Sequence, residues 1–300
     1  MTASPQAATA EIAALPLARE GRLALLSRPL VMGVLNLTPD SFSDGGRWVE
    51  PRRAVDHALR MLDKGADLID LGAESTRPGG GVYGTGAREV PAAEELERLL
   101  PVLSRLRRTT ERPLSVDTRK AVVARRALAE GADLINDVSA LGDPDMAGVV
   151  VAAGCAVVLM HSRGELASMQ RGIGFRDVVA EVRAELAERA DAALAAGISR
   201  TAIVLDPGIG FGKTVAQNLE LLRRLDLLDL ELPLLVGASR KSFIGALSGA
   251  EPDDRLAGSL AAVAWAAFHG AAMVRVHDVA ESRQFLEVWN AIRDAGQVRP

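Results

Sequence analysis

The sequence contains little cysteine, little lysine and no long apolar run. Its single cysteine, among 300 residues, excludes an intramolecular disulfide framework and suits a reducing compartment, so we expect a cytoplasmic protein. Cys155 lies in the apolar segment AAGCAVVLM, which indicates a buried, inert thiol. No cysteine or histidine spacing typical of a zinc site occurs, and no stretch is apolar for long enough to span a membrane. The formal charge of −4 gives no electrostatic footprint for nucleic acid or an anionic membrane, so neither is expected as a partner.

Short β-rich apolar runs alternate with helical patterns through the chain. The runs lie at 30–36, 67–73, 113–118, 134–139, 156–161, 202–207, 233–239 and 273–279. The clearest helical pattern covers 176–196, where apolar residues share one face. Glycines that follow helical stretches and precede strands predict left-handed caps at Gly65, Gly131, Gly154, Gly197 and Gly270. The segments GADLID (65–70) and GADLIND (131–137) repeat one such junction.

Strands separated by helices run parallel, with right-handed crossovers. Eight such units predict an α/β fold, a single-domain TIM (β/α)8 barrel over residues 29–296, with an open doubly wound sheet as the alternative. Residues 1–28 are predicted to be an N-terminal segment that is partly a disordered tail. Their start is alanine-rich, without the basic and apolar regions of a signal peptide.

Polar residues stand at the carboxyl end of every predicted strand, where barrel enzymes place their catalytic groups. Buried polar groups are costly unless a partner or ligand satisfies them, so we interpret the set as a site. Structural hydrogen bonding at these ends is the alternative interpretation. The set includes Asn36, Thr76, Asp117, Asn136, His161, Asp206, Lys241, Arg275 and His277.

Single motifs at these ends differ in specificity. GIGFGKT resembles a phosphate loop, but Pro207 stands where the first glycine would be required, which disfavours nucleotide binding. Arg275 and His277 alternate along one strand, so both side chains point to the same side, as an anion site would need. A packed or surface histidine is the alternative for His277. Lys241 is either a solvated loop lysine or a functional one, and Arg77 lies in a glycine-rich segment typical of mobile loops.

Seven segments, in order, resemble the dihydropteroate synthase family. They are NLTPDSFSDGG (36–46), DLGAESTRPG (70–79), SVDT (115–118), IND (135–137), DPGIGFGK (206–213), GASRKSFIG (237–245) and RVHDV (275–279). The resemblance extends over nearly the whole chain. The segment MHSRGELASMQ (160–170) departs from the family pattern, in which a Gly-Thr-Pro-like turn more often precedes Met-Gln.

The resemblance implies a reaction and a set of site residues. The reaction joins 6-hydroxymethyl-7,8-dihydropterin diphosphate to p-aminobenzoate and gives 7,8-dihydropteroate and diphosphate. Pterin binding falls to Asp117, Asn136, Asp206 and Lys241, with Met160 and Phe211 lining the flat faces of the slot. Diphosphate binding falls to Thr76, Arg275 and His277, and Asn36 is implied as the ligand of a Mg²⁺ ion.

The resemblance also implies a second substrate pocket and a partner. Phe42, Pro78 and Ser242 are implied to bind p-aminobenzoate, with Asp44 and Arg77 closing the loops 37–48 and 75–86 over it. Catalysis, centred on Lys241, Arg275 and His277, would rest on charge stabilisation and positioning. A homodimer is implied as well. The alternatives are a pterin-barrel methyltransferase acting on a corrinoid partner, and a catalytically silent paralogue that binds a pterin or a protein.

Overall fold

A computed structural model describes residues 13–38, 51–74, 90–164, 172 and 174–295. Eight parallel strands form one sheet in the order β8-β7-β6-β5-β4-β3-β10-β9. Leu205 and Leu234 form a parallel bridge between β8 and the start of β9, so the two edges of the sheet meet. The predicted barrel is therefore confirmed, and the open sheet is excluded. The strands are β3 (Leu30–Asn36), β4 (Leu68–Gly72), β5 (Leu114–Asp117), β6 (Leu134–Asp137), β7 (Val157–Met160), β8 (Ile203–Asp206), β9 (Leu235–Val236) and β10 (Met273–Val276).

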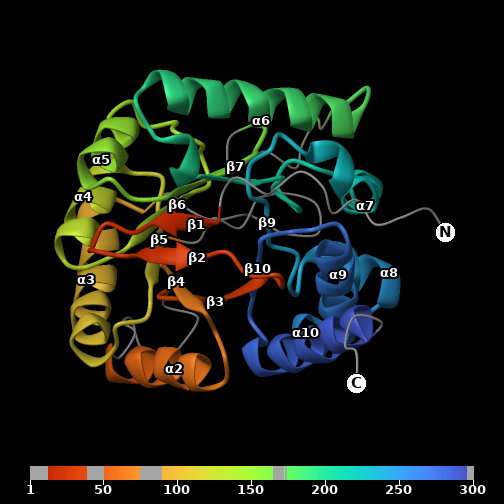
Figure 1. The fold of residues 1–300 in the computed structure, drawn as a ribbon, viewed down its shortest axis with the longest axis horizontal. Coiled ribbons are helices and arrows are strands. Elements are labelled where there is room, and N and C mark those ends of the chain that lie inside the picture. The colour runs from red at the N-terminus through yellow and green to blue at the C-terminus, as the bar shows by residue number, and fades with distance from the viewer. Residues whose placement is uncertain (1–12, 39–50, 75–89, 165–171, 173, 296–300) are drawn as a thin grey trace.

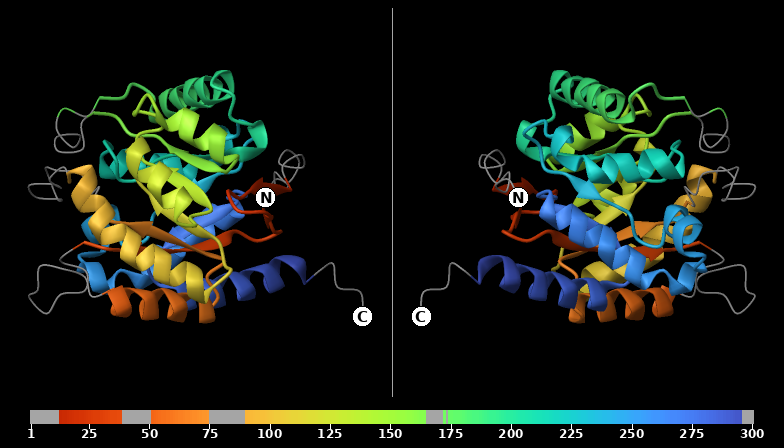
Figure 2. Two further views of the ribbon diagram at one scale, coloured as in Figure 1. Left: turned by 90° about the vertical axis from the view of Figure 1, so that its left-hand side faces the viewer. Right: turned by 90° about the vertical axis from the view of Figure 1, so that its right-hand side faces the viewer.

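Helices surround the barrel (Figures 1 and 2). They are α2 (Pro51–Asp63), α3 (Ala92–Thr109), α4 (Ala121–Ala129), α5 (Met146–Ala153), α6 (Val178–Ala195), α7 (Val215–Arg223), α8 (Ser242–Ser248), α9 (Leu256–Phe268) and α10 (Val279–Asp294). Short 3-10 turns lie at Arg200–Ala202, Leu225–Leu228 and Pro252–Asp254. Within the described ranges, no helix combines the length and the apolarity needed to cross a bilayer.

Local sequence signals explain most element boundaries. The predicted helix at 176–196 begins at Val178. The Asp177 carboxylate caps it by accepting hydrogen bonds from the backbone amides of Val179 and Ala180. All five predicted cap glycines have positive φ, between 62° and 105°. β9 is shorter than the predicted run 233–239. Its backbone leaves the ladder after Val236 and turns at Arg240, whose φ of 57° ends any strand.

Part of the N-terminal segment is an ordered hairpin. β1 (Ala14–Pro16) and β2 (Arg22–Ala24) pair antiparallel, and Leu15 in the middle of β1 is completely buried. The Pro16 carbonyl accepts the amide of Ala156, which precedes β7. The hairpin therefore continues the hydrogen bonding at the amino end of the barrel, while residues 1–12 of the expected tail lie outside the described part.

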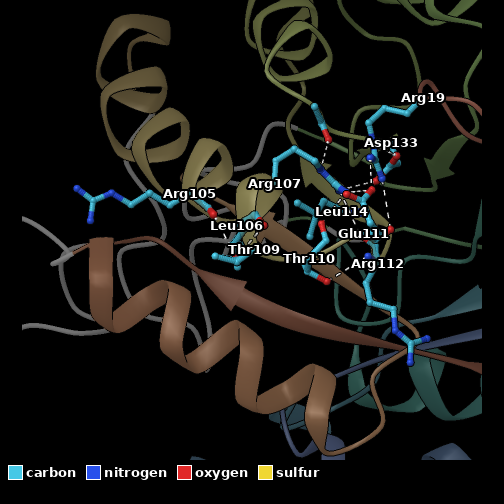
Figure 3. A network of polar contacts seen from close by, with 11 residues as sticks. Arg19, Arg105, Leu106, Arg107, Thr109, Thr110, Glu111, Arg112, Leu114 and Asp133 are labelled. Atoms are coloured by element: carbon cyan, nitrogen blue, oxygen red, sulfur yellow. Dashed lines mark hydrogen bonds and ion pairs between the residues drawn. The ribbon is translucent and has the colours of Figure 1, made fainter.

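Asp133 joins this hairpin to the barrel (Figure 3). Its carboxylate is fully buried and accepts hydrogen bonds from Arg19 Nε at 2.9 Å, from Arg107 Nη2 at 2.8 Å and from the Leu114 amide at 2.8 Å. One side chain thereby links the hairpin, α3 and the start of β5.

Asp67 repeats the arrangement before β4. It accepts a two-pronged pair from Arg28, at 2.7 and 2.8 Å, and the Val31 amide at 2.7 Å. A Cβ at Gly65 would lie 2.7 Å from Arg283 Cγ, as one at Gly131 would lie 2.7 Å from Arg107 Cγ. The repeated Gly-Ala-Asp thus encodes a repeated anchor, in which the glycine lets an arginine pass and the aspartate fixes the preceding strand.

We predict that Asp133→Ala lowers the free energy of unfolding by about 3 kcal/mol, because it leaves buried donors without their acceptor. Urea denaturation measures the change. Glu111→Ala is the matched control, since Glu111 also pairs with Arg19 but its side chain is 87% exposed. That control should change stability far less, because exposed ion pairs contribute little. Equal effects of the two substitutions would contradict the anchoring role of Asp133.

Candidate active site

Arg275 of β10 occupies the centre of a polar cluster inside the barrel. Its Nε donates to Asp70 Oδ2 of β4 at 2.6 Å, and its Nη2 donates to Asp117 Oδ2 of β5 at 2.9 Å. Asn136 Nδ2 of β6 donates to the same Asp70 oxygen at 2.9 Å. Predicted site residues on three strands are thus brought into one hydrogen-bonded network, which we call the arginine cluster (Asp70, Asp117, Asn136 and Arg275).

Asp70 was not among the predicted site residues. It lies in the middle of an apolar strand, and its partner Arg275 is 205 residues away in the sequence. The signal that could have found it is the internal repeat, because GADLID and GADLIND align Asp70 with Asn136. These two aligned residues are the ones that bond to each other.

The two carboxylates of the arginine cluster retain acceptors that nothing else in the described ranges fills. Oδ1 of Asp70 and Oδ1 of Asp117 are both buried, and neither accepts a hydrogen bond there. Burial raises the pKa of Asp117 to about 7; Asp70 raises it further, whereas the Arg275 charge opposes the shift. The cluster therefore presents a half-protonated acid near neutral pH, beside a fixed positive charge.

A second group lies across Gly237 from this cluster. A Cβ at Gly237 would be in ordinary contact with both, 3.7 Å from Arg275 Cβ and 3.8 Å from Asp206 Oδ2, so Gly237 lies between the two groups. Asp206 ends β8; its Oδ1 accepts the Gly208 amide at 2.7 Å, and burial raises its pKa. Lys241 donates to the Ile209 carbonyl, and burial lowers its pKa to about 8.

The turn after Asp206 requires its glycines. Gly208 has φ of +65°, and a Cβ there would lie 1.8 Å from the His161 carbonyl oxygen. Gly212 has φ of +61°, and its Cβ would lie 2.6 Å from the Arg163 carbonyl oxygen. The turn is therefore pressed against the end of β7, which leaves the ring of Phe211 under Lys241, 4.5 Å from Nζ to the ring centroid.

The other described candidates stand at neighbouring strand ends. Met160 ends β7, is 4% exposed and pairs in register with Asp206. His277 Nδ1 lies 3.1 Å from Ser239 Oγ, which ties the loop after β10 to the loop after β9. Asn36 ends β3 and is partly exposed, and Ser242 is the first residue of α8. The candidates Phe42, Asp44, Thr76, Arg77 and Pro78 lie outside the described residues.

Two further ion pairs hold the loops of the site. Arg240 donates to both carboxylate oxygens of Asp278, at 3.0 and 2.5 Å, and so joins the residue before Lys241 to the residue after His277. Glu74 accepts from the Val90 amide at 3.0 Å and from Lys120 Nζ at 2.7 Å. Glu74 and Val90, which flank the segment 75–89, are thereby joined by a hydrogen bond. Sequence reasoning did not assign these roles, because each depends on contacts between separate loops.

The donor set suits a flat heterocycle with an anionic group better than a cage of metal ligands. Within the ranges the structure describes, no three His, Cys, Asp or Glu side chains gather as a metal site would need. The predicted Mg²⁺ ligand Asn36 would supply one amide oxygen, so the remaining ligands would come from substrate and water.

The raised pKa of Asp117 gives a pH-dependent stability. Between pH 3.8 and about pH 7, the folded chain holds a proton on Asp117 that the unfolded chain lacks. The free energy of unfolding of the wild type should therefore fall, relative to Asp117→Asn, as pH rises through this range. Denaturation of both ligand-free proteins at about pH 5 and about pH 8 measures this. A wild-type-minus-variant difference that stays constant would show that Asp117 ionises normally.

Comparisons with known proteins agree with this geometry. The model of the pterin binding enzyme family matches residues 32–277. Dihydropteroate synthase of Escherichia coli (strain K12) is 44% identical over 271 residues, which cover 90% of this chain and 94% of that protein.

Two solved structures are similar throughout. Xanthomonas albilineans dihydropteroate synthase with 4-aminobenzoic acid is 47% identical, with a TM-score of 0.85 over 95% of this chain and 100% of that one. Burkholderia cenocepacia dihydropteroate synthase complexed with 7,8-dihydropteroate is 43% identical, with a TM-score of 0.84 over 96% and 99%. With the barrel, the arginine cluster and the Asp206 turn in place, these matches show that the chain belongs to the dihydropteroate synthase family of pterin binding enzymes.

Proposed function

We propose that this protein condenses 6-hydroxymethyl-7,8-dihydropterin diphosphate with p-aminobenzoate, releasing 7,8-dihydropteroate and diphosphate. The observation that carries the proposal is the arginine cluster beside Asp206 and Lys241. It combines buried, unfilled carboxylate acceptors with partly buried positive charge. The relatives' complexes with 4-aminobenzoic acid and with 7,8-dihydropteroate support the choice of substrates.

The pterin would bind through its ring nitrogens. Its amidine-like edge carries two parallel N–H donors, which match one carboxylate, and Asp206 is buried at the base of the slot. The free Oδ1 of Asp117 and the amide of Asn136 would bond other ring atoms. Lys241 would donate to the opposite edge, with Met160 and Phe211 against the ring faces.

The diphosphate would bind beside Arg275 and His277, with Thr76 as a hydroxyl donor. Arg275 already pairs with two carboxylates, so its charge is held in place before substrate arrives. Asn36 would hold a Mg²⁺ ion together with diphosphate oxygens. When bound, the ion would neutralise charge on the departing diphosphate. The Arg275 guanidinium would stabilise the same charge from the protein side.

The second substrate would complete its site from loops. Ser242 follows Lys241 directly and would contact p-aminobenzoate with Phe42 and Pro78, while Asp44 and Arg77 close the loops. The carbon–oxygen bond to diphosphate would break first, with the positive charge delocalised into the dihydropterin ring. The aniline nitrogen would then attack the methylene carbon and lose one proton to solvent. No side chain has to form a covalent bond, so positioning and charge account for the catalysis.

Two alternatives explain fewer of these residues. A methyltransferase acting on a corrinoid partner would use the pterin contacts but leave Arg275 and His277 without a shared ligand. A silent paralogue would have no reason to keep a buried cation that two carboxylates must compensate. We also propose a cytoplasmic location, because a single cysteine among 300 residues suits a reducing compartment.

We further propose a homodimer that uses α9 and α10. These helices pack side by side (Figure 1), and both expose large apolar side chains. Trp265 and Phe268 of α9 are 42% and 51% exposed, and Val288 and Ile292 of α10 are 55% and 71% exposed. A second copy of the chain would remove this apolar surface from water.

Turnover tests the proposed reaction directly. The wild type should release diphosphate only when both substrates and Mg²⁺ are present. Asp206→Asn keeps an acceptor for Gly208 but loses the charge that the pterin edge needs, so kcat/KM should fall about a hundredfold. Asp63→Asn, on the exposed surface of α2, is the control and should leave kcat/KM unchanged. Release of diphosphate without p-aminobenzoate, or an Asp206→Asn variant of wild-type activity, would refute the proposal.

A charge on α9 tests the homodimer. Phe268→Glu should convert the protein to a monomer, because a carboxylate would be buried against a second apolar face. Light scattering after size-exclusion chromatography measures the mass. Val151→Glu on α5, where the wild-type side chain is 43% exposed on another side of the barrel, should leave the dimer intact. A wild type that runs as a monomer at all concentrations would exclude this interface.

A further inference from the structure

Lys213 is a buried lysine that the proposed reaction does not use. It ends the DPGIGFGK segment and is 3% exposed. Its Nζ lies 2.9 Å from His161 Nδ1, 3.0 Å from the Gly208 carbonyl oxygen and 2.9 Å from the Phe211 carbonyl oxygen. The His161 carbonyl oxygen lies farther from Nζ, at 3.4 Å, so four acceptors surround the amino group inside the protein.

Burial lowers the pKa of Lys213 to about 7, and the Asp206 charge opposes this shift. The contacts favour the ammonium form, because all four partners accept and the three protons of –NH₃⁺ can serve the three shorter contacts. The tautomer of His161 agrees with this, since its Nε2 lies 3.0 Å from Glu185 Oε2 and donates there, which leaves the Nδ1 lone pair facing Lys213. Burial and the Lys213 charge lower the pKa of His161 to about 2, so the imidazole stays neutral. Asp206, Lys241, Glu185 and Arg163 are the other charged groups around Lys213.

The carbonyls that Lys213 holds belong to the turn that presents the pterin site. Gly208 and Phe211 bracket this turn, and the Ile209 carbonyl between them accepts from Lys241 on the ligand side. On the α7 side, the Gly210 amide donates to Asn218 Oδ1 at 2.6 Å. Lys213 therefore holds the two ends of the turn, and Lys241 and Asn218 each hold one peptide group between them.

We propose that Lys213 is a positioning residue for the pterin substrate, acting with His161. Its ammonium fixes the turn so that Asp206 and the Phe211 ring face the pterin, while the lysine itself touches no substrate. This role is the reverse of a phosphate-loop lysine, which points out of its loop toward the ligand. The inference rests on the proposed function, because it assigns the turn to the pterin.

Steady-state kinetics at saturating concentrations of the other substrate test the inference. Lys213→Met keeps the length of the side chain but donates nothing, so KM for the pterin diphosphate should rise about tenfold or more. KM for p-aminobenzoate should stay within about twofold, because that substrate does not contact the turn. Lys64→Met, at an exposed lysine directly after α2, is the control and should change neither KM.

A pair of substitutions at His161 keeps the test decisive if Lys213→Met does not fold. His161→Asn retains an acceptor near the position of Nδ1, whereas His161→Leu removes it. The first should keep pterin KM within about threefold of wild type, and the second should raise it about tenfold. Equal pterin KM values for these two variants, or parallel changes in KM for both substrates, would overturn the positioning role. A wild type without turnover in the same assay would instead refute the proposed function.

Discussion

The charge of Arg275 inside the barrel is the constraint on which the site depends. A guanidinium largely removed from water needs opposite charge at close range. Asp70 of β4 and Asp117 of β5 supply that negative charge to Arg275, which lies on β10. This requirement accounts for carboxylates in the middle and at the end of otherwise apolar strands. Burial at this position raises the pKa of Asp117, and the nearby Asp70 carboxylate raises it further against the opposing charge of Arg275. A site built this way has its cation oriented in the absence of ligand, which is what charge stabilisation during catalysis requires.

The repeated segments GADLID and GADLIND each contribute one residue to the amino face of the barrel and one residue to the site. In GADLID and GADLIND, the aspartates Asp67 and Asp133 fix neighbouring strands at the amino face through arginine and backbone donors. Three residues further on, Asp70 and Asn136 bond to each other within the arginine cluster. Three steps along a strand carry the chain from the anchoring end toward the site. Stability and site geometry are therefore encoded in adjacent positions of one repeat.

Local pattern predicts the elements of this fold well, and long-range pairing far less well. Hydrophobic runs located all eight strands, and the five cap glycines were identified from their positions, because both signals arise within a few residues. The strand-end rule brought Asp117, Asn136, Asp206, Lys241 and Arg275 to one region for the same reason. Asp70, the Arg240–Asp278 pair and the inward orientation of Lys213 were missed. Each depends on a partner brought close only by closure of the barrel or by packing of separate loops.

The cations of the site are all bound by the protein itself, and this determines how a substrate can bind. Arg275 pairs with two carboxylates, Lys241 with the Ile209 carbonyl, and Lys213 with two carbonyls and an imidazole. A pterin diphosphate at the proposed site would therefore exchange partners rather than meet bare charge. Lys241 would exchange the Ile209 carbonyl for the pterin. Arg275 would instead share its charge between carboxylates and phosphate, and a proton on Asp117 would favour the phosphate. Lys213 exchanges no partner, since it bonds to backbone carbonyls and to a buried imidazole. It can therefore keep the turn fixed while Lys241 and Arg275 bind the substrate.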